Sequence, residues 1–427
     1  MTMSTALLTD HYELTMLQAA LRSGAAHRRA VFEVFARHLP GGRRYGVVAG
    51  TGRILDELER FRFGDEELTF LREQEVVDES TLAFLADYRF SGNVYGYREG
   101  DLYFPASPIM IVEGTFAEAV LLETLTLSIL NHDCAIASAA SRMTNAAGKR
   151  PLIEMGSRRT HEYAAVAAAR AAYIAGFAST SNLMAGHVYG VPTAGTAAHA
   201  FTLLHDSERD AFEAQIASLG VGTTLLVDTY DVEQAVRTAV ELAGSKLGAV
   251  RIDSGDLAAA AQEVRELLDS LGAFDTRIVV TSDLDEYAIA ALAAAPVDGY
   301  GVGTSLVTGS GVPTAALVYK LVARETGAGR LEAVAKRSVG KPSRGGRKEA
   351  YRLLDAGGHV ETELITTGGV VPDGGIPLLH ELVRDGEVVG REPLSAARDR
   401  HAEAVALLPQ EALHLGRGYA AIPTEFV

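Results

Sequence analysis

The sequence of 427 residues contains one cysteine, Cys134, and no tryptophan. A single cysteine excludes an internal disulfide and any zinc site built from several cysteines, and it favours a cytoplasmic protein. Basic residues are also few, because 39 lysines and arginines against 55 aspartates and glutamates give a formal net charge of −16. A general nucleic-acid or anionic-membrane surface needs a net basic footprint, so we expect neither partner.

Long apolar runs are absent as well. The nearest to a membrane span covers residues 164–178, but Arg170 interrupts it and it is shorter than the roughly 20 apolar residues required. We therefore interpret it as a closely packed helix that runs into a strand. The first residues lack the basic and long apolar regions of a secretory signal, and none is expected.

An acidic chain must meet an anionic substrate with local groups of arginines. The pair Arg158 and Arg159 and the basic run Lys336–Lys348 are such groups. Each group alone is more often a solvated surface than a binding site. Charge therefore permits an anionic substrate but does not locate its site.

Seven short apolar runs follow residue 150, each ending in a polar or glycine-bearing turn, with helical patterns between them. The runs are 151–159, 176–182, 191–199, 224–231, 249–256, 277–285 and 299–305. Apolar strands that alternate with helices indicate parallel strands buried on both faces. Seven such units, with an eighth possible at 333–338, predict an α/β fold with a closed or nearly closed (β/α) barrel.

The remaining parts of the chain have a different pattern. Residues 31–50, 90–114 and 377–389 are rich in glycine, aromatic residues and alternation, which predicts antiparallel sheet. A chain of this length also favours two packed units. We therefore predict an N-terminal α+β sheet domain to which the C-terminal tail returns. The predicted boundaries are 1–120 for the sheet domain, 121–340 for the barrel and 341–427 for the returning segment.

A polar residue stands near the end of each of the seven predicted strands. These residues are Glu154, Ser179, Thr196, Asp228, Asp253, Ser282 and Thr304. Any one of them alone is more often a helix N-cap. Seven in the same phase of the repeat instead favour a shared site at the carboxyl ends of the strands.

The glycine-rich segment 299–311 follows the seventh strand. Its backbone amides near Gly301 and Gly303, with the hydroxyl of Thr304, can hold a phosphate. Late strands of barrels commonly bind phosphate, which strengthens this interpretation.

Two acidic turns follow neighbouring strands, RIDSGD at 251–256 and TSDLDEY at 281–287. Their carboxylates, such as Asp253 and Asp283, suit ribose hydroxyls or a hydrated Mg²⁺, and they equally suit helix caps. The pair of turns favours a sugar-phosphate or metal-diphosphate ligand. The segment SRRT at 157–160 offers bidentate donors to a carboxylate or phosphate, with a surface salt-bridge network as the alternative.

Seven segments occur in the order and roughly the spacing of the nicotinate phosphoribosyltransferases, over nearly the whole chain. They are TDHYELTM (9–16), FEVFARHLP (32–40), EMGSRRTHEY (154–163), GTAAHAF (195–201), VRIDSGDL (250–257), GVGTSLVT (301–308) and VYKLV (318–322). The resemblance implies a type II phosphoribosyltransferase with a sandwich-like N-terminal domain and an irregular α/β barrel. It also implies a homodimer whose active sites take residues from both subunits.

The implied reaction is the first step of NAD salvage from nicotinate. Nicotinate and phosphoribosyl diphosphate give nicotinate mononucleotide and diphosphate, with Mg²⁺ and with coupling to ATP hydrolysis. A lone histidine such as His199 is more often a core or capping residue. The resemblance instead makes His199 the residue that ATP phosphorylates, and a neutral imidazole is a competent nucleophile for that step.

The resemblance also assigns roles by matched position. Tyr12, Thr196, Arg251 and Arg158 correspond to nicotinate contacts, and His199, Arg251 and Asp253 to catalytic residues. The implied contacts to phosphoribosyl diphosphate are Thr304, Gly303, Gly301, Asp253, Asp283 and Arg159. No metal ligands follow from it.

One stretch departs from the family pattern. Residues 336–352 are compressed and altered, which leaves their contacts to ATP or diphosphate open, and the cysteine-bound zinc of some members cannot form here. Two alternatives remain: an inert or regulatory sugar-phosphate-binding protein on the same fold, and a related nicotinamide or quinolinate enzyme. Arg251 favours an acid over an amide, because a neutral amide would leave the guanidinium unpaired.

Overall fold

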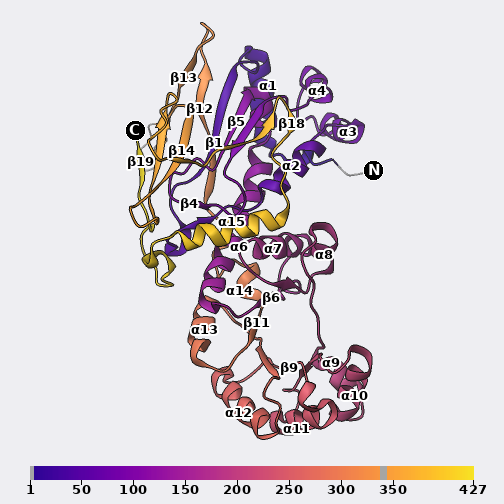
Figure 1. Cartoon of the computed structure of the whole chain (residues 1–427). Coiled ribbons are helices and arrows are strands. Elements are labelled where there is room, and N and C mark those ends of the chain that lie inside the picture. Colours follow the sequence, from indigo (N-terminus) through magenta and orange to yellow (C-terminus); the bar gives the residue numbers. More distant parts are fainter. Residues whose placement is uncertain (1–3, 337–343) are drawn as a thin grey trace. The chain divides into compact units, whose positions relative to one another are not determined.

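The computed structural model describes residues 4–336 and 344–427, which form two compact units (Figure 1). The first unit comprises Met1–Ser138 with Val312–Val427, and the second comprises Ala139–Gly311. Residues 121–138 and 312–340, predicted as barrel, therefore fall in the first unit. The reason is strand pairing, because β12 (Leu317–Glu325) pairs antiparallel with β1 (Arg29–Ala36).

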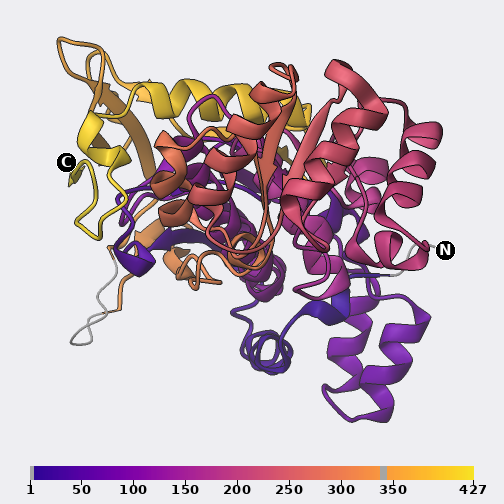
Figure 2. The same cartoon turned by 90° about the horizontal axis from the view of Figure 1, so that it is seen from below.

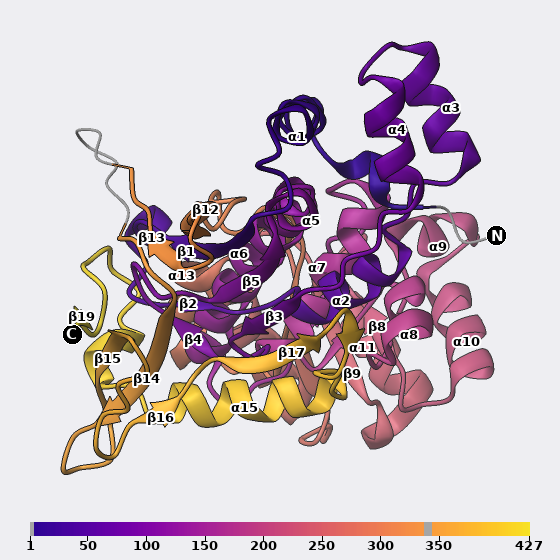
Figure 3. The ribbon, with the colours of Figure 1, turned by 90° about the horizontal axis from the view of Figure 1, so that it is seen from above.

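The main sheet of the first unit is antiparallel, as predicted, with the strand order β13-β12-β1-β5-β3-β17-β18. Its further strands are β3 (Asn93–Gly96), β5 (Met110–Thr115), β13 (Leu331–Ala333), β17 (His380–Arg384) and β18 (Glu387–Val388). Strand β17 lies beside β3 in Figure 3, so the C-terminal segment extends a sheet built by N-terminal residues.

Smaller sheets and several helices complete the first unit. A four-stranded sheet has the order β16-β14-β15-β19, and β2 pairs with β4. Their bounds are β14 (Lys348–Leu354), β15 (Val360–Thr367), β16 (Ile376–Pro377), β19 (Thr424–Phe426), β2 (Gly46–Val47) and β4 (Leu102–Tyr103). The helices are α1 (His11–Ser23), α2 (Thr51–Arg60), α3 (Asp65–Glu73), α4 (Glu79–Ala86), α5 (Phe116–Val120), α6 (Glu123–Ala147), which continues into the second unit, and α15 (Leu394–Ala406).

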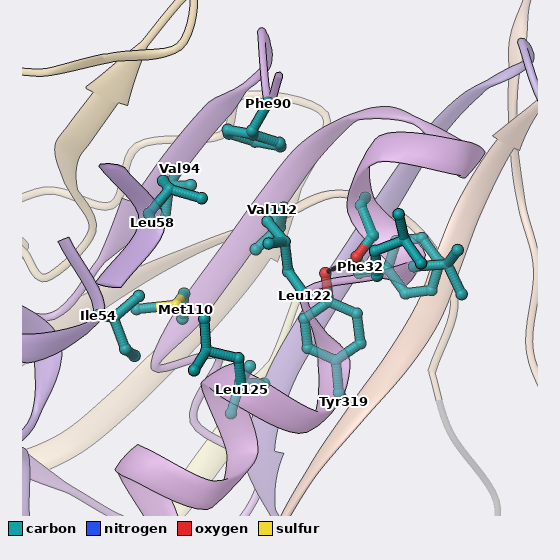
Figure 4. Close-up of a cluster of buried hydrophobic side chains, with 14 of the residues drawn as sticks. Phe32, Ile54, Leu58, Phe90, Val94, Met110, Val112, Leu122, Leu125 and Tyr319 are labelled. Atoms are coloured by element: carbon teal, nitrogen blue, oxygen red, sulfur yellow. Dashed lines mark hydrogen bonds between the residues drawn. The ribbon is translucent and has the colours of Figure 1, made fainter. Parts of the chain in front are cut away.

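The core of the first unit lies between its main sheet and the helices α2, α5 and α6 (Figure 4). Phe32 and Tyr319, on the neighbouring strands β1 and β12, stack with 4.9 Å between ring centroids. The Tyr319 hydroxyl donates a 2.7 Å hydrogen bond to the Ala119 carbonyl. Aromatic side chains bury large apolar areas, and this bond satisfies the polar end of the tyrosine.

An ion pair lies buried between the altered stretch and β1. Lys348 Nζ lies 2.6 Å from Glu33 Oε2 and donates to the Arg344 carbonyl, and the two side chains are only 2% and 4% exposed. Burial raises the pKa of the Glu33 carboxyl, and the Lys348 charge opposes that rise. Through Lys348, the C-terminal part of the stretch 336–352 is thus anchored to β1. Residues 337–343 of the same stretch lie outside the described part of the chain.

Lys348→Met should lower the free energy of unfolding by about 3–5 kcal/mol, because it leaves the Glu33 carboxylate buried without its cation. Urea denaturation measures this loss. Lys246→Met, at an exposed lysine, is the control and should change stability by less than about 0.5 kcal/mol. A loss below about 1 kcal/mol for Lys348→Met would show that Glu33 is neutral or finds another partner.

The second unit contains a parallel sheet in the order β7-β6-β11-β10-β9-β8, which confirms the predicted α/β class. Its strands are β6 (Leu152–Glu154), β7 (Ser179–Thr180), β8 (Thr224–Leu226), β9 (Ala249–Ile252), β10 (Arg277–Val280) and β11 (Gly299–Val302). The helices are α7 (Glu162–Ile174), α8 (Leu183–Tyr189), α9 (His199–Leu204), α10 (Glu208–Leu219), α11 (Val232–Ala243), α12 (Leu257–Ser270), α13 (Glu286–Ala291) and α14 (Thr304–Val307).

These strands follow the order of a barrel with one open seam. The last strand, β11, pairs with the first, β6, and a bridge between Thr180 and Thr193 continues the ring beyond β7. In the described part of the chain no pairing joins Thr193 to β8. The predicted third strand at 191–199 is reduced to this bridge, because its glycine and alanines pack poorly as strand residues. Figure 2 shows the curved strands with helices on their outer side.

Two further predictions concern the barrel and the apolar helices. Of the predicted eighth strand at 333–338, Ala333 belongs to β13 of the first unit, and residues 337 and 338 lie outside the described ranges. Helix α7 is a packed helix before β7, as predicted, and even Arg170 is only 6% exposed. The stretch Phe116–Ala147 is long and apolar enough to cross a membrane, but 67% of its apolar window is buried, as in a core helix.

Candidate active site

A cavity of about 210 Å³ lies at the carboxyl ends of β6, β9, β10 and β11. Nine of the residues predicted from the sequence line it: Arg158, Arg159, Arg251, Asp253, Ser282, Asp283, Gly301, Gly303 and Thr304. Met155 and Thr281 complete the lining. Four strand ends thus supply one cavity, because parallel strands of a barrel open at the same rim.

Arg251 lies at the centre of the polar contacts of the cavity. Its Nε donates a 3.0 Å hydrogen bond to Thr281 Oγ1, and its Nη2 lies 3.3 Å from Asp253 Oδ1. Its Nη1 lies 3.3 Å from the Ala197 carbonyl and 3.5 Å from Thr196 Oγ1. Thr281 Oγ1 also bonds Asp253 Oδ1. The guanidinium is therefore held from three sides, which fixes its plane for a bidentate ligand.

Arg158 and Arg159 give the cavity further positive charge. Both side chains are exposed, and neither guanidinium has an ion-pair or hydrogen-bond partner among the residues that the structure describes. Together with Arg251 they place three cations against the carboxylates of Asp253 and Asp283. The cavity is therefore locally suited to an anion, although the chain carries a net charge of −16.

Backbone shape also contributes to the cavity. A Cβ on Gly301 would lie 2.5 Å from Thr281 Cγ2 and 2.7 Å from Met155 Sδ, so only glycine fits between these side chains. Gly303 has more room, since its nearest neighbour would be the Met155 carbonyl at 3.5 Å. Ser282 has a φ of 124°, a strained value for a residue other than glycine, and such strain is often found at functional sites.

His199 is not a lining residue of the cavity, but hydrogen bonds connect it to the lining. Its Nε2 lies 3.1 Å from Oδ1 of Asp228, which stands two residues after the end of β8. Asp228 Oδ2 accepts a 2.8 Å bond from the Asp253 amide and a 2.7 Å bond from Ser254 Oγ. Burial works to raise the pKa of Asp228, but hydrogen bonds from Ser254, Asp253 and His199 lower it overall. The Asp228 carboxylate is therefore ionised beside the imidazole.

Two other predicted residues do not line the cavity. Thr196 lines a separate groove of about 470 Å³ with Ala197, Ala198 and residues of α10, and touches the cavity only through Arg251. Tyr12 belongs to the first unit, in the first turn of α1, with 42% of the residue exposed. Burial, followed by the charges of Glu123, Glu13 and Asp10, raises the pKa of its hydroxyl to about 12.

Glu154 has a structural role and does not line the cavity. It is fully buried at the end of β6 and accepts hydrogen bonds from the Gly156 amide and the Thr180 hydroxyl. Burial raises the pKa of its carboxyl, and these two bonds oppose the rise. It joins β6 to β7 and fixes the turn that presents Arg158.

Sequence reasoning noted Asp228 as a strand-end residue but did not identify it as the partner of His199, and it missed Ser254 and Thr281. The position of a residue within the strand–helix repeat indicates whether it reaches the rim. It does not show which side chains contact one another. Metal ligands remain unassigned, because the described ranges contain no group of three or more histidine, cysteine, aspartate or glutamate residues placed to hold an ion.

Comparison with known proteins gives full-length similarities. The family model for the nicotinate phosphoribosyltransferase N-terminal domain matches residues 7–131. The chain is 58% identical over 432 residues to nicotinate phosphoribosyltransferase pncB1 of Mycobacterium tuberculosis, covering 99% of this chain and 95% of that protein. It is 38% identical to the nicotinate phosphoribosyltransferase of Bacillus subtilis, over 83% and 74% of the two chains. The crystal structure of human nicotinic acid phosphoribosyltransferase matches with a TM-score of 0.83 and 27% identity, covering 98% and 97% of the two chains.

Proposed function

The chain belongs to the nicotinate phosphoribosyltransferase family, and from this premise we propose how its cavity carries out the reaction. The enzyme forms nicotinate mononucleotide and diphosphate from nicotinate and phosphoribosyl diphosphate, a step of NAD salvage. The observation that carries the assignment of the site is the convergence of Arg251, Arg158 and Arg159 with two acidic turns on one small cavity. Full-length similarity to enzymes favours this function over an inert sugar-phosphate-binding protein.

In the proposed mechanism, Arg251 binds the carboxylate of nicotinate and aims the ring nitrogen at C1 of the ribose. The nitrogen attacks with its free lone pair, so no base has to remove a proton. The bond from C1 to the diphosphate oxygen breaks ahead of the attack, and the departing diphosphate takes the electron pair. Catalysis then depends on positioning and on neutralising this charge by Arg159 and by Arg158, which the resemblance alone assigns to nicotinate. The amide of Gly303 and the hydroxyl of Thr304 are placed to contact phosphate oxygens, and Asp253 and Asp283 to contact ribose hydroxyls.

Mg²⁺ fits this cavity as an ion that enters with the substrate. Mg²⁺ keeps several waters and is usually held by one or two carboxylates together with substrate phosphates. The Asp283 side chain is exposed at the cavity and is the carboxylate best placed to reach such an ion. When bound, the ion would neutralise charge on the diphosphate. Arg251 and Thr281 already engage Asp253, which suits that residue to ribose hydroxyls.

We assign the phosphoryl acceptor to Nδ1 of His199. Asp228 engages Nε2, so a neutral imidazole carries its proton there and leaves the lone pair on Nδ1. Attack on the γ-phosphorus of ATP forms the Nδ1–P bond and breaks the bond to the ADP oxygen. The ring becomes positively charged, and the Asp228 carboxylate stabilises it. Asp228 also accepts a hydrogen bond from the Asp253 amide, so the phosphorylation of His199 is connected directly to the ribose side of the cavity.

In this proposal Tyr12 reaches the nicotinate site from a second subunit, as the family resemblance implies for a homodimer. The residue is 42% exposed, which leaves it available to a second chain. Mixing the inactive variants Tyr12→Ala and Arg251→Ala should restore part of the activity, because one mixed site regains both residues. No recovery in the mixture, with dimers shown by light scattering, would place Tyr12 outside the site.

The test of ATP coupling uses nucleotide formation with and without ATP. The parent enzyme should form nicotinate mononucleotide faster with ATP, whereas His199→Ala should keep some synthesis and lose the stimulation. His205→Ala is the matched control, because that ring bonds only the Phe201 carbonyl of its own helix in the described structure. ATP stimulation of His199→Ala equal to that of the parent would remove the phosphohistidine from the mechanism.

Substrate selectivity follows from the charge on Arg251. Nicotinate should be preferred over nicotinamide by at least about a hundredfold in kcat/KM, because the neutral amide gives up the charged bond that the substrate carboxylate makes with the guanidinium. Parallel initial-rate measurements with both substrates decide this. Comparable rates would show that Arg251 does not meet the substrate carboxylate.

A further inference from the structure

Thr281 stands directly after β10 and lines the cavity, although only 3% of the residue is exposed. Its backbone amide donates a 2.9 Å hydrogen bond to the Ile252 carbonyl of β9. The parallel pairing of β9 and β10 therefore extends to this residue. The side chain of Thr281 thus begins from a backbone position that two strands hold in place.

The hydroxyl of Thr281 is hydrogen-bonded to two side chains of the cavity. It accepts a 3.0 Å bond from Nε of Arg251. A guanidinium has no acceptor and an ionised carboxylate has no donor, so the one proton of the hydroxyl goes to Oδ1 of Asp253. Both bonds therefore have a fixed direction, and one hydroxyl places the arginine and the aspartate together.

The methyl group of Thr281 determines where this hydroxyl points. A Cβ on Gly301, in the neighbouring strand β11, would lie 2.5 Å from Thr281 Cγ2, so the methyl packs closely over the glycine backbone. A β-branched side chain has few χ1 rotamers. Contact of the methyl with Gly301 selects one of them, and in that rotamer the hydroxyl faces Arg251 and Asp253.

These contacts determine which edge of the Arg251 guanidinium can bind a ligand. A guanidinium offers a bidentate acceptor two edges, one formed by Nε with Nη2 and the other by Nη1 with Nη2. In the described structure Thr281 and Asp253 occupy the first edge, with Asp253 Oδ1 3.3 Å from Nη2. The Ala197 carbonyl, 3.3 Å from Nη1, takes one further N–H. Nη1 and Nη2 each keep one N–H for a carboxylate at the second edge.

We propose that Thr281 is a positioning residue for substrate specificity, because it holds Arg251 so that the Nη1–Nη2 edge meets the carboxylate of nicotinate. The inference rests on the proposed binding of that carboxylate by Arg251. Without the hydroxyl, Nε loses its acceptor and the guanidinium can turn its other edge toward an anion. An aligned edge favours the acid over the amide, since only a carboxylate offers two equivalent anionic oxygens to two donors.

Thr281→Val tests this role because valine keeps the branched shape and removes the hydroxyl. The kcat/KM for nicotinate should fall by about tenfold, while that for nicotinamide should stay within about twofold of the parent, so the ratio of the two falls about tenfold. A general loss of active protein would lower both rates and leave the ratio unchanged. Thr281→Ser keeps the hydroxyl and should restore most of the parent ratio.

Thr276→Val is the matched control at the other end of β10. Thr276 is 1% exposed, and its hydroxyl donates a 3.0 Å bond to the Leu247 carbonyl. This substitution also removes a buried hydroxyl beside β10, but Thr276 does not line the cavity. Its ratio of nicotinate to nicotinamide kcat/KM should equal that of the parent.

Exchange of the Arg251 Nε proton with solvent measures the contact itself. NMR can follow this proton, with the signal assigned by its loss in Arg251→Met. Exchange should become at least about tenfold faster in Thr281→Val, because the hydrogen bond that protects the proton is gone. It should stay at the parent rate in Thr276→Val.

The outcomes separate this inference from the proposed function. An unchanged substrate ratio or an unchanged exchange rate in folded Thr281→Val would overturn the role of Thr281, even if Arg251→Met is nearly inactive. Parent-like rates in Arg251→Met would instead overturn the proposed role of Arg251, and with it the specificity role of Thr281. Faster exchange in Thr281→Val would then still show that Thr281 holds the guanidinium. Should Thr281→Val fail to fold, Thr281→Ala takes its place and is judged by the same two results.

Discussion

Arg251→Met should lower kcat/KM for nicotinate by about a thousandfold or more, equivalent to about 4 kcal/mol of transition-state stabilisation. The expected loss is large because the guanidinium is the proposed partner of the substrate carboxylate and also holds Thr281, Asp253 and the Ala197 carbonyl in place. Methionine keeps most of the side-chain volume and removes every donor. Initial rates over a range of nicotinate concentrations measure the effect.

A matched arginine separates the role in the cavity from a general loss of charge. Arg237→Met removes a surface cation of α11 that bonds Glu233, and its kcat/KM should stay within about twofold of the parent. Circular dichroism and the unfolding midpoint show whether Arg251→Met is folded. A folded Arg251→Met enzyme with less than a tenfold loss would mean that another residue binds the carboxylate.

Asp228→Asn should slow phosphohistidine formation by about 10²- to 10³-fold while ATP-independent synthesis largely persists. Asparagine keeps the shape of the side chain, but it removes the negative charge that stabilises the positively charged ring after phosphoryl transfer. It can also turn its NH₂ toward Nε2, which moves the ring proton to Nδ1 and blocks the attacking lone pair. Rapid-quench measurements with radiolabelled ATP give the rate.

Asp285→Asn is the control for this experiment. Asp285 caps α13 by accepting from the Tyr287 and Ala288 amides, and asparagine is an equally good cap. Its rate of phosphorylation should match that of the parent. A parent-like rate in Asp228→Asn would show that the charge of Asp228 is not needed and that its contact with His199 is only structural.

Much of the second unit could be predicted from its sequence. Apolar runs that end in a polar residue predicted the strands β6 to β11, and the common position of those residues in the repeat predicted that Asp253, Ser282 and Thr304 approach one rim. Such predictions succeed because the geometry of parallel strands brings their carboxyl ends together whatever the details of packing. The strand that follows the barrel was harder to predict, because alternation within β12 does not reveal that its pairing partner is β1.

The contact between His199 and Asp228 joins two parts of the chain that are 29 residues apart. No local pattern in the sequence predicts it. Electrostatic coupling of this kind is a property of tertiary packing, so pattern and composition could not supply it.

The most direct test of the central claim is to locate the phosphoryl group after the protein has been incubated with ATP and Mg²⁺. Mass spectrometry under alkaline conditions should find one acid-labile phosphate per chain, on His199, and adding nicotinate with phosphoribosyl diphosphate should remove it as nucleotide forms. Stable phosphate on another residue, or no phosphate on His199 while ATP still stimulates synthesis, would contradict the account.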